Sequence, residues 1–275
     1  MTVTVYLPGG IHRDGSHHRS ACLHPVDGEL EMTIAACDKT TISRPARTTH
    51  ILTSAVERIG DLVMNRELAE ELSVGDRTFL MLHIGAMVAG DNVWSTSRCS
   101  CCGEQFDICV KRTGLTIRES SHTYPITKIA LNGTSVLVRT PIGADQQWLC
   151  DHRPSNPRAA LLARCITTVN DKQPHDKDGY VAGLGEAERD ILEQVIESMG
   201  PEVECSLSTR CPECGKQQRI NFDPCRFHGS MDDLEKQIHT LAFYYHWSEG
   251  DILSIPRNRR LRYLQMIERE RGLYG

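Results

Sequence analysis

The chain has 275 residues, of which 40% are apolar and 24% are charged, and its formal net charge is −5. This composition is typical of a folded chain with its own core and excludes global disorder, and the acidic balance disfavours a protein that coats nucleic acid. No run of about 18 apolar residues is present to span a membrane. Because the first residues lack the basic and apolar segments of a signal peptide, we expect synthesis in the cytoplasm. Twelve cysteines in that compartment favour metal ligation or burial over disulfides.

An internal repeat of roughly 110 residues organises the sequence. Each half begins with a strand-like segment, at residues 5–9 and 129–133, followed by a turn rich in Pro and Gly. Apolar residues then recur on one helical face over residues 51–59 and 161–169. A second apolar helix follows a charged start in each half, over residues 75–87 and 186–199, and each half ends in C-x-x-C-G and a short strand. We therefore predict an α+β fold of two duplicated strand-helix-helix-knuckle units, residues 1–112 and 113–225.

The remaining residues, 226–275, have no counterpart in this repeat. Residues 234–245 form an amphipathic helical pattern, Ser248 caps a short helix, and Pro256 suits the first turn of another. We predict an α-helical C-terminal module that docks on a partner. Two segments rich in His, Gly, Asp, Lys and Pro, residues 10–20 and 171–185, are predicted to be exposed loops.

The two C-x-x-C-G knuckles carry the strongest chemical signal. Each knuckle presents two thiolates from one tight turn, and the glycine permits the geometry of that turn. Zinc prefers four ligands in a tetrahedron, and two knuckles supply four thiolates. If the duplicated halves are related by a pseudo-twofold axis, their equivalent points meet on it. The sequence therefore predicts one structural, zinc-ribbon-like Zn²⁺ site, whose ligands are Cys99, Cys102, Cys211 and Cys214.

Other readings of the cysteines stay open at this point. All four could be buried thiols without a metal, since cysteine is often buried. Alternatively, two separate sites could form, in which Cys101 or Cys109 joins the first knuckle and Cys205 or Cys225 joins the second. The remaining cysteines are predicted to be core residues: Cys22, Cys37, Cys150 and Cys165.

Nothing in the sequence indicates catalysis. Four protein ligands leave no open coordination position on the zinc, which argues against a zinc hydrolase. The sequence contains no H-E-x-x-H, G-x-S-x-G or phosphate-binding glycine loop. We expect a protein that is not an enzyme.

The C-terminal segment resembles a known family. Residues 238–256 form a helix followed by the turn Trp247-Ser248-Glu249, and residues 259–264 follow with Arg-Arg and Tyr-Leu. This pattern, together with the paired knuckles, resembles the phage baseplate family that includes hub and baseplate assembly proteins of T-even-type contractile phages, with relatives in phage-tail-like injection systems. The resemblance implies a structural or assembly role in the baseplate, hub or wedge proteins as partners, and a place in the assembled tail after synthesis in the bacterial cytoplasm.

Large aromatic residues and arginines in the C-terminal module are candidate partner contacts, because such side chains carry much of the binding energy at interfaces. They are Tyr244, Tyr245, Trp247, Arg259, Arg260 and Tyr263. The same aromatics could instead form a local core. A competing hypothesis is a zinc-ribbon regulatory protein that binds nucleic acid, with the arginines of residues 257–262 on a recognition helix. Nearby acidic residues disfavour this hypothesis, so we do not expect nucleic acid as a partner. Because no segment is long and apolar enough to span a membrane, we do not expect a membrane partner either.

Overall fold

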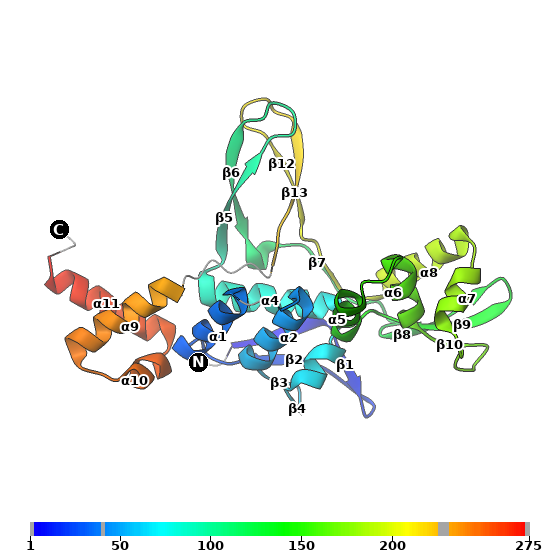
Figure 1. Cartoon of the computed structure of the whole chain (residues 1–275), viewed down its shortest axis with the longest axis horizontal. Helices are drawn as coiled ribbons and strands as arrows, with labels where there is room; N and C mark the ends of the chain where they lie inside the picture. The colour runs from blue at the N-terminus through cyan, green and yellow to red at the C-terminus, as the bar shows by residue number, and fades with distance from the viewer. Residues whose placement is uncertain (1–2, 40–41, 225–230, 273–275) are drawn as a thin grey trace.

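The computed structural model describes residues 3–39, 42–224 and 231–272, which form an α+β structure (Figure 1). The helices follow one another along a row, and two long β-hairpins stand out from the middle of that row. As described, the chain contains no helix that is both long and apolar enough to cross a membrane.

The first half begins with a four-stranded antiparallel sheet and ends in a hairpin. Strands β1 (Val3–Arg13), β2 (Ser16–Leu23), β3 (Val56–Ile59) and β4 (Leu62–Val63) pair in that order. Helices α1 (Gly28–Lys39) and α2 (Arg44–Ala55) lie between β2 and β3 in sequence. Helices α3 (Arg66–Glu71) and α4 (Val74–Ala89) then lead to the hairpin of β5 (Asn92–Arg98) and β6 (Gln105–Lys111).

The second half has a similar order of elements, except that none of its described strands corresponds to β4. Strands β8 (Ile126–Leu131), β9 (Thr134–Arg139) and β10 (Ile166–Val169) form a sheet, with α5 (Gly143–His152) and α6 (Pro157–Cys165) between the last two in sequence. Helices α7 (Lys177–Gly183) and α8 (Glu186–Met199) lead to the hairpin of β12 (Ser206–Arg210) and β13 (Gln217–Asn221). Between the halves, a short helix (Arg112–Gly114) precedes β7 (Ile117–Arg118), which pairs with β11 (Glu202–Val203).

Four sequence predictions need correction. The helices expected over residues 51–59 and 161–169 end at Ala55 and Cys165, and the chain continues directly as β3 and β10. Both strands are rich in β-branched residues and pair antiparallel with the second strand of their own sheet. Residues 10–20 are not a loop but the turn and flanks of the β1–β2 hairpin, and residues 171–185 contain α7.

Each half has its own hydrophobic core. The first core contains Leu7, Leu23, Leu52 and Leu80, which come from the sheet and from α2 and α4 and are fully buried. The second core draws on β9, α6 and α8 and contains Val136, Val138, Leu162 and Leu192. The predicted apolar face of α4 is buried at Leu80 and Ile84, and that of α8 at Leu192 and Ile196, whereas Ile191 of the same predicted face is 48% exposed.

The C-terminal module has the helices that its sequence predicts: α9 (Met231–Tyr245), α10 (Glu249–Ser254) and α11 (Arg257–Glu270). Ser248 caps α10, since its hydroxyl accepts the N–H of Asp251 at 3.1 Å. Leu241, Ile252 and Ile267 form a small core between the three helices. The module packs on α1, through α9 and α10.

Candidate metal centre

Two antiparallel hairpins carry the cysteine knuckles at their tips. Hairpin β5–β6 pairs Asn92 with Lys111 at its base and Arg98 with Gln105 below the first knuckle. Hairpin β12–β13 pairs Ser206 with Asn221 at its base and Arg210 with Gln217 below the second. The hairpins belong to different halves of the chain but converge at their tips (Figure 1).

The two knuckles have the same backbone geometry. In the first, the N–H of Cys99 donates to the carbonyl of Glu104 at 2.9 Å, and the N–H of Gly103 donates to Cys99 at 3.1 Å. In the second, Cys211 donates to Lys216 at 3.0 Å and Gly215 donates to Cys211 at 2.9 Å. Both glycines have positive φ, 78° and 69°, the region that favours glycine. Cys99 thus corresponds to Cys211, and Cys102 to Cys214.

The four sulfur atoms of these residues meet in one cluster. The Sγ atoms of Cys99 and Cys214 are 3.6 Å apart, those of Cys102 and Cys211 are 3.7 Å apart, and all four lie within 4.8 Å of one another. Tetrahedral zinc with Zn–S bonds of about 2.3 Å places its sulfurs about 3.8 Å apart, so the observed spacing suits a tetrahedral thiolate site. The structure therefore brings together the four residues predicted as ligands.

The environment of the thiols affects their pKa values in opposite directions. The backbone N–H groups of Cys102 and Cys101, together with neighbouring thiols, lower the pKa of Cys99 to about 6 despite its burial. The N–H of Glu104 lowers the pKa of Cys102, but burial and the three other sulfurs outweigh it and raise that pKa to about 12. Four thiols in so small a volume cannot all ionise without a cation between them, and a divalent metal would supply that charge.

Contacts around the sulfurs fix one knuckle against the other. The side chain of Gln218 on β13 is buried, and its Oε1 accepts the N–H of Ser100 at 3.0 Å and the Ser100 hydroxyl at 2.9 Å. Phe106 packs beside the buried sulfurs of Cys99 and Cys211. The contact of Gln218 with the first knuckle could not be predicted from the sequence, because no local pattern shows which glutamine faces the other hairpin.

The other cysteines lie outside this cluster. Cys101 and Cys109 are exposed, Cys205 is half-buried, and Cys225 lies outside the described residues. Cys22, Cys37 and Cys165 are buried as predicted, whereas Cys150 is exposed on α5 and the prediction of a core residue is wrong there. Because the cluster contains Cys99 and Cys102 but not Cys101, the first knuckle has the predicted register.

The candidate partner contacts of the C-terminal module have different environments. The rings of Tyr245 and Trp247 stack with their centroids 4.7 Å apart, and Tyr263 packs edge-on against both. Arg259 is exposed and lies over the ring of Tyr263, whereas Arg260 is fully buried and pairs with Glu31. Tyr244 is 38% exposed beside Phe243, which is 68% exposed and was not predicted as a contact.

Comparison with known families identifies the chain. Residues 30–225 match the family described as T4 bacteriophage base plate protein, so the protein belongs to that family. No curated protein and no solved structure matches the chain significantly. The match includes both knuckles and ends before α9.

Proposed function

We propose that this protein is a structural or assembly component of the baseplate of a contractile phage tail or a phage-tail-like injection system. Membership of the baseplate family carries this proposal. The sequence, with its lack of catalytic motifs, supports a role without enzymatic activity. We expect the protein to be made in the bacterial cytoplasm and to act with other baseplate proteins, of the hub or the wedge.

A single structural Zn²⁺ held by the two knuckles is part of this proposal. Its support is the cluster of four sulfurs. They come from two knuckles whose nearest cysteines, Cys102 and Cys211, are 109 positions apart, yet they lie at the spacing of a tetrahedral site. An ion there would join the tips of the two hairpins, and its binding energy would add to the stability of the fold.

We further propose that the two halves arose by internal duplication. The repeated order of elements and the equal register of the two knuckles support this origin. Duplication accounts for the long separation between the knuckles, because each half supplies one of them.

The alternative function, a regulator that binds nucleic acid, is less well supported. Arg257 and Arg260 would have to contact phosphates or bases, but both pair with Glu31 of α1 and Arg260 has no exposed surface. Only Arg259 and Arg262 of the four arginines proposed for the recognition helix are exposed.

Assembly in a producing cell tests the proposed function. A tagged full-length chain should co-sediment with tail particles or with baseplate intermediates, and deletion of the gene should prevent normal baseplates from forming. If deletion of the gene leaves both the number and the shape of the tails unchanged, the proposal is contradicted. A salt-dependent DNA affinity of the purified protein would favour the alternative.

A further inference from the structure

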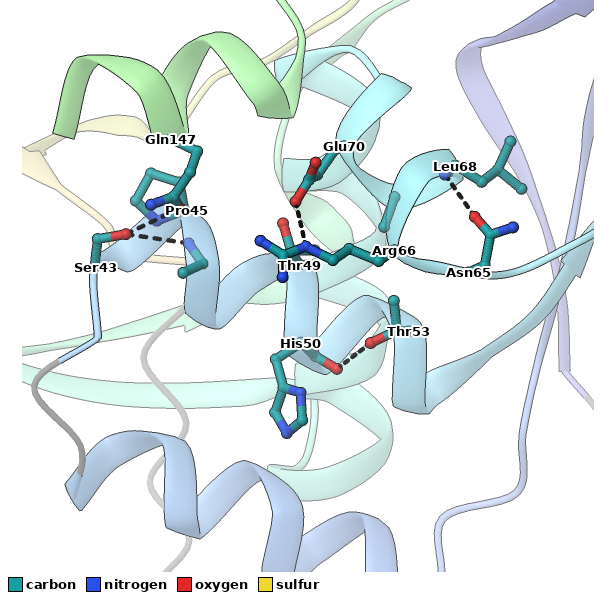
Figure 2. A network of polar contacts seen from close by, with 12 residues as sticks. Ser43, Pro45, Thr49, His50, Thr53, Asn65, Arg66, Leu68, Glu70 and Gln147 are labelled. Atoms are coloured by element: carbon teal, nitrogen blue, oxygen red, sulfur yellow. Dashed lines mark hydrogen bonds and ion pairs between the residues drawn. The ribbon is translucent and has the colours of Figure 1, made fainter. Parts of the chain in front are cut away.

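The bodies of the two halves are joined by polar contacts that do not involve the hairpins. The hydroxyl of Ser43, the cap of α2, donates to the side chain of Gln147 on α5 at 3.0 Å, as Figure 2 shows. The N–H of Val74, the first residue of α4, donates to the carbonyl of Pro141 at 3.2 Å. These contacts hold the first half against the second whatever the state of the hairpin tips.

The hairpin tips have few contacts of their own. Within the described residues, β5–β6 and β12–β13 form separate two-stranded sheets, so no strand ladder joins one hairpin to the other. Gln218 binds Ser100, and a small apolar cluster brings Phe106 and Ile108 together with Ile220. The junction of the tips therefore depends largely on what connects the four sulfurs.

Two sulfur pairs bridge the knuckles, and each combines an exposed cysteine with a buried one. The Sγ of the exposed Cys214 lies 3.6 Å from that of the buried Cys99. The Sγ of the exposed Cys102 lies 3.7 Å from that of the buried Cys211. A small oxidant in solution can thus reach one sulfur of each pair directly, while the other sulfur of that pair is shielded beside it.

We propose that this cluster is an oxidation site for hydrogen peroxide, at which two disulfides between the knuckles take the place of a metal: Cys99–Cys214 and Cys102–Cys211. The inference rests on the sulfur cluster of the proposed metal site. A metal holds the tips together in a reducing compartment, and the disulfides hold them together in an oxidising one, where free thiols do not persist.

At each pair the exposed sulfur reacts first. As a thiolate it attacks one oxygen of the peroxide, the O–O bond breaks, and the products are a sulfenic acid and a hydroxide ion that takes up the thiol proton. The buried thiol of the same pair then attacks the sulfenic sulfur, so that the S–S bond forms and water leaves. Each pair converts two thiols and one peroxide into one disulfide and two waters, and the two electrons lost by the sulfurs reduce the peroxide.

The competing product has one disulfide inside each knuckle, Cys99–Cys102 and Cys211–Cys214. Those bonds close loops of a few residues, whereas the bonds between the knuckles join residues 115 and 109 positions apart. A disulfide that closes a longer loop restricts the unfolded chain more and so stabilises the fold more. Bonds between the knuckles require the sulfurs to approach from 3.6 and 3.7 Å to about 2.0 Å, which rotation of the side chains can supply.

Peptide mapping of the full-length protein tests the proposal. The wild type is freed of metal with a chelator, oxidised with excess hydrogen peroxide, blocked with N-ethylmaleimide and digested with trypsin without reductant. Trypsin releases residues 99–111 and 211–216 as separate peptides, because it cleaves after lysine and arginine. We expect mass spectrometry to find the two peptides linked by two disulfides. Two unlinked peptides, with internal disulfides or with sulfinic acids, would overturn the proposal.

Single replacements assign the pairs. Cys214→Ser should leave the two peptides linked by Cys102–Cys211 alone, with Cys99 blocked by N-ethylmaleimide. Cys101→Ser is the matched control, since Cys101 is exposed but lies outside the cluster, and it should keep both links of the wild type. A link through Cys99 in the first variant, or loss of a link in the second, would contradict the pairing. Circular dichroism verifies the fold of each variant, and the wild-type result does not depend on either of them.

The melting temperature tests whether the disulfides hold the tips together. The oxidised wild type should melt about 5 °C or more above the reduced, metal-free protein. Equal melting temperatures would show that the new bonds do not stabilise the junction and would overturn this role. The mapping uses metal-free protein, so a chain that is purified without zinc but forms both links would contradict the metal site and leave the oxidation site standing.

Discussion

The guanidinium of Arg260 is fully buried against the carboxylate of Glu31, which precedes it by 229 residues. Arg257 binds the same carboxylate at 2.6 Å. Burial lowers the pKa of Arg260, so the buried charge depends on its carboxylate partner. This cluster joins the C-terminal module to the start of α1.

Loss of Arg260 should therefore be costly. We predict that Arg260→Ala lowers the free energy of unfolding by about 1.5–3 kcal/mol, because it removes a buried hydrogen bond between charged groups, while Arg257 still pairs with Glu31. Urea unfolding measures the change. Arg259→Ala, at an exposed position one residue earlier, should cost about 0.5 kcal/mol or less. Equal costs for the two variants would show that the Glu31 contact contributes little.

Purified protein should contain one zinc ion per chain. The four clustered sulfurs motivate this prediction, and elemental analysis with a protein assay measures it. A strong chelator should lower the melting temperature of the protein, because a structural metal contributes folding free energy. Zero or two zinc ions per chain would contradict the single site.

Replacement of individual cysteines distinguishes ligands from bystanders. Cys211→Ser should remove the zinc and lower the melting temperature, since one thiolate of four is lost from the tetrahedral site. Cys101→Ser should leave the zinc content and the melting temperature unchanged, because that side chain is exposed and lies outside the cluster. Equal loss of zinc in both variants would mean that the first knuckle uses another register.

Asp145 should contribute to unfolding by acid. Burial raises its pKa, but hydrogen bonds and charge from Arg139 at 2.6 Å and from Arg164 at 2.8 Å outweigh burial and leave it below the ordinary value. A folded pKa below the unfolded pKa means that the stabilisation is complete above about pH 4 and is lost as the pH falls through the folded pKa.

The variant Asp145→Asn tests this dependence. It should be less stable than the wild type by about 1–3 kcal/mol at pH 7, and the difference should shrink as the pH falls below about 4. Urea unfolding at a series of pH values measures it. Asp171→Asn, which removes an exposed partner of Lys128, is the matched control and should show little difference at any pH. A constant difference for Asp145→Asn down to pH 3 would contradict the linkage.

The exposed face of α9 is a candidate contact for other baseplate proteins. Phe243 is 68% exposed and packs edge-on against the partly exposed Tyr244. We predict that Phe243→Ser with Tyr244→Ser leaves the melting temperature within a few degrees but lowers incorporation into tail particles at least tenfold, since large exposed apolar side chains mark interaction sites. Normal incorporation would exclude this face from the interface.

The sequence predicted the cysteine cluster better than it predicted the helices. Both knuckles could be found because a tight turn with two cysteines is a local pattern, and the repeat suggested that they meet. Val56 and Ile59 fit the apolar period of the preceding helix, so the change to a strand at that point was hidden. Only their pairing with β2 reveals it, and that contact is between residues distant in sequence.

Buried polar groups were harder still to predict. The sequence shows Asp76 and Arg77 as the charged start of a helix, and nothing in that pattern shows that both are fully buried. Asp76 accepts the N–H groups of Gly9 and Gly10 at 2.8 and 3.0 Å, and its role depends on where β1 lies in the folded chain.

The separation of the two knuckles along the chain has a consequence during synthesis. Cys102 leaves the ribosome 109 residues before Cys211, the sulfur that it faces in the folded protein. At translation rates of about 5–20 residues per second, the first two thiols wait roughly 5–20 s for the second pair. During that interval the nascent chain presents a half-formed site that is open to oxidants and to any other protein with free thiols. We therefore expect synthesis in a reducing compartment, where the four-sulfur cluster is completed only once the second half has emerged.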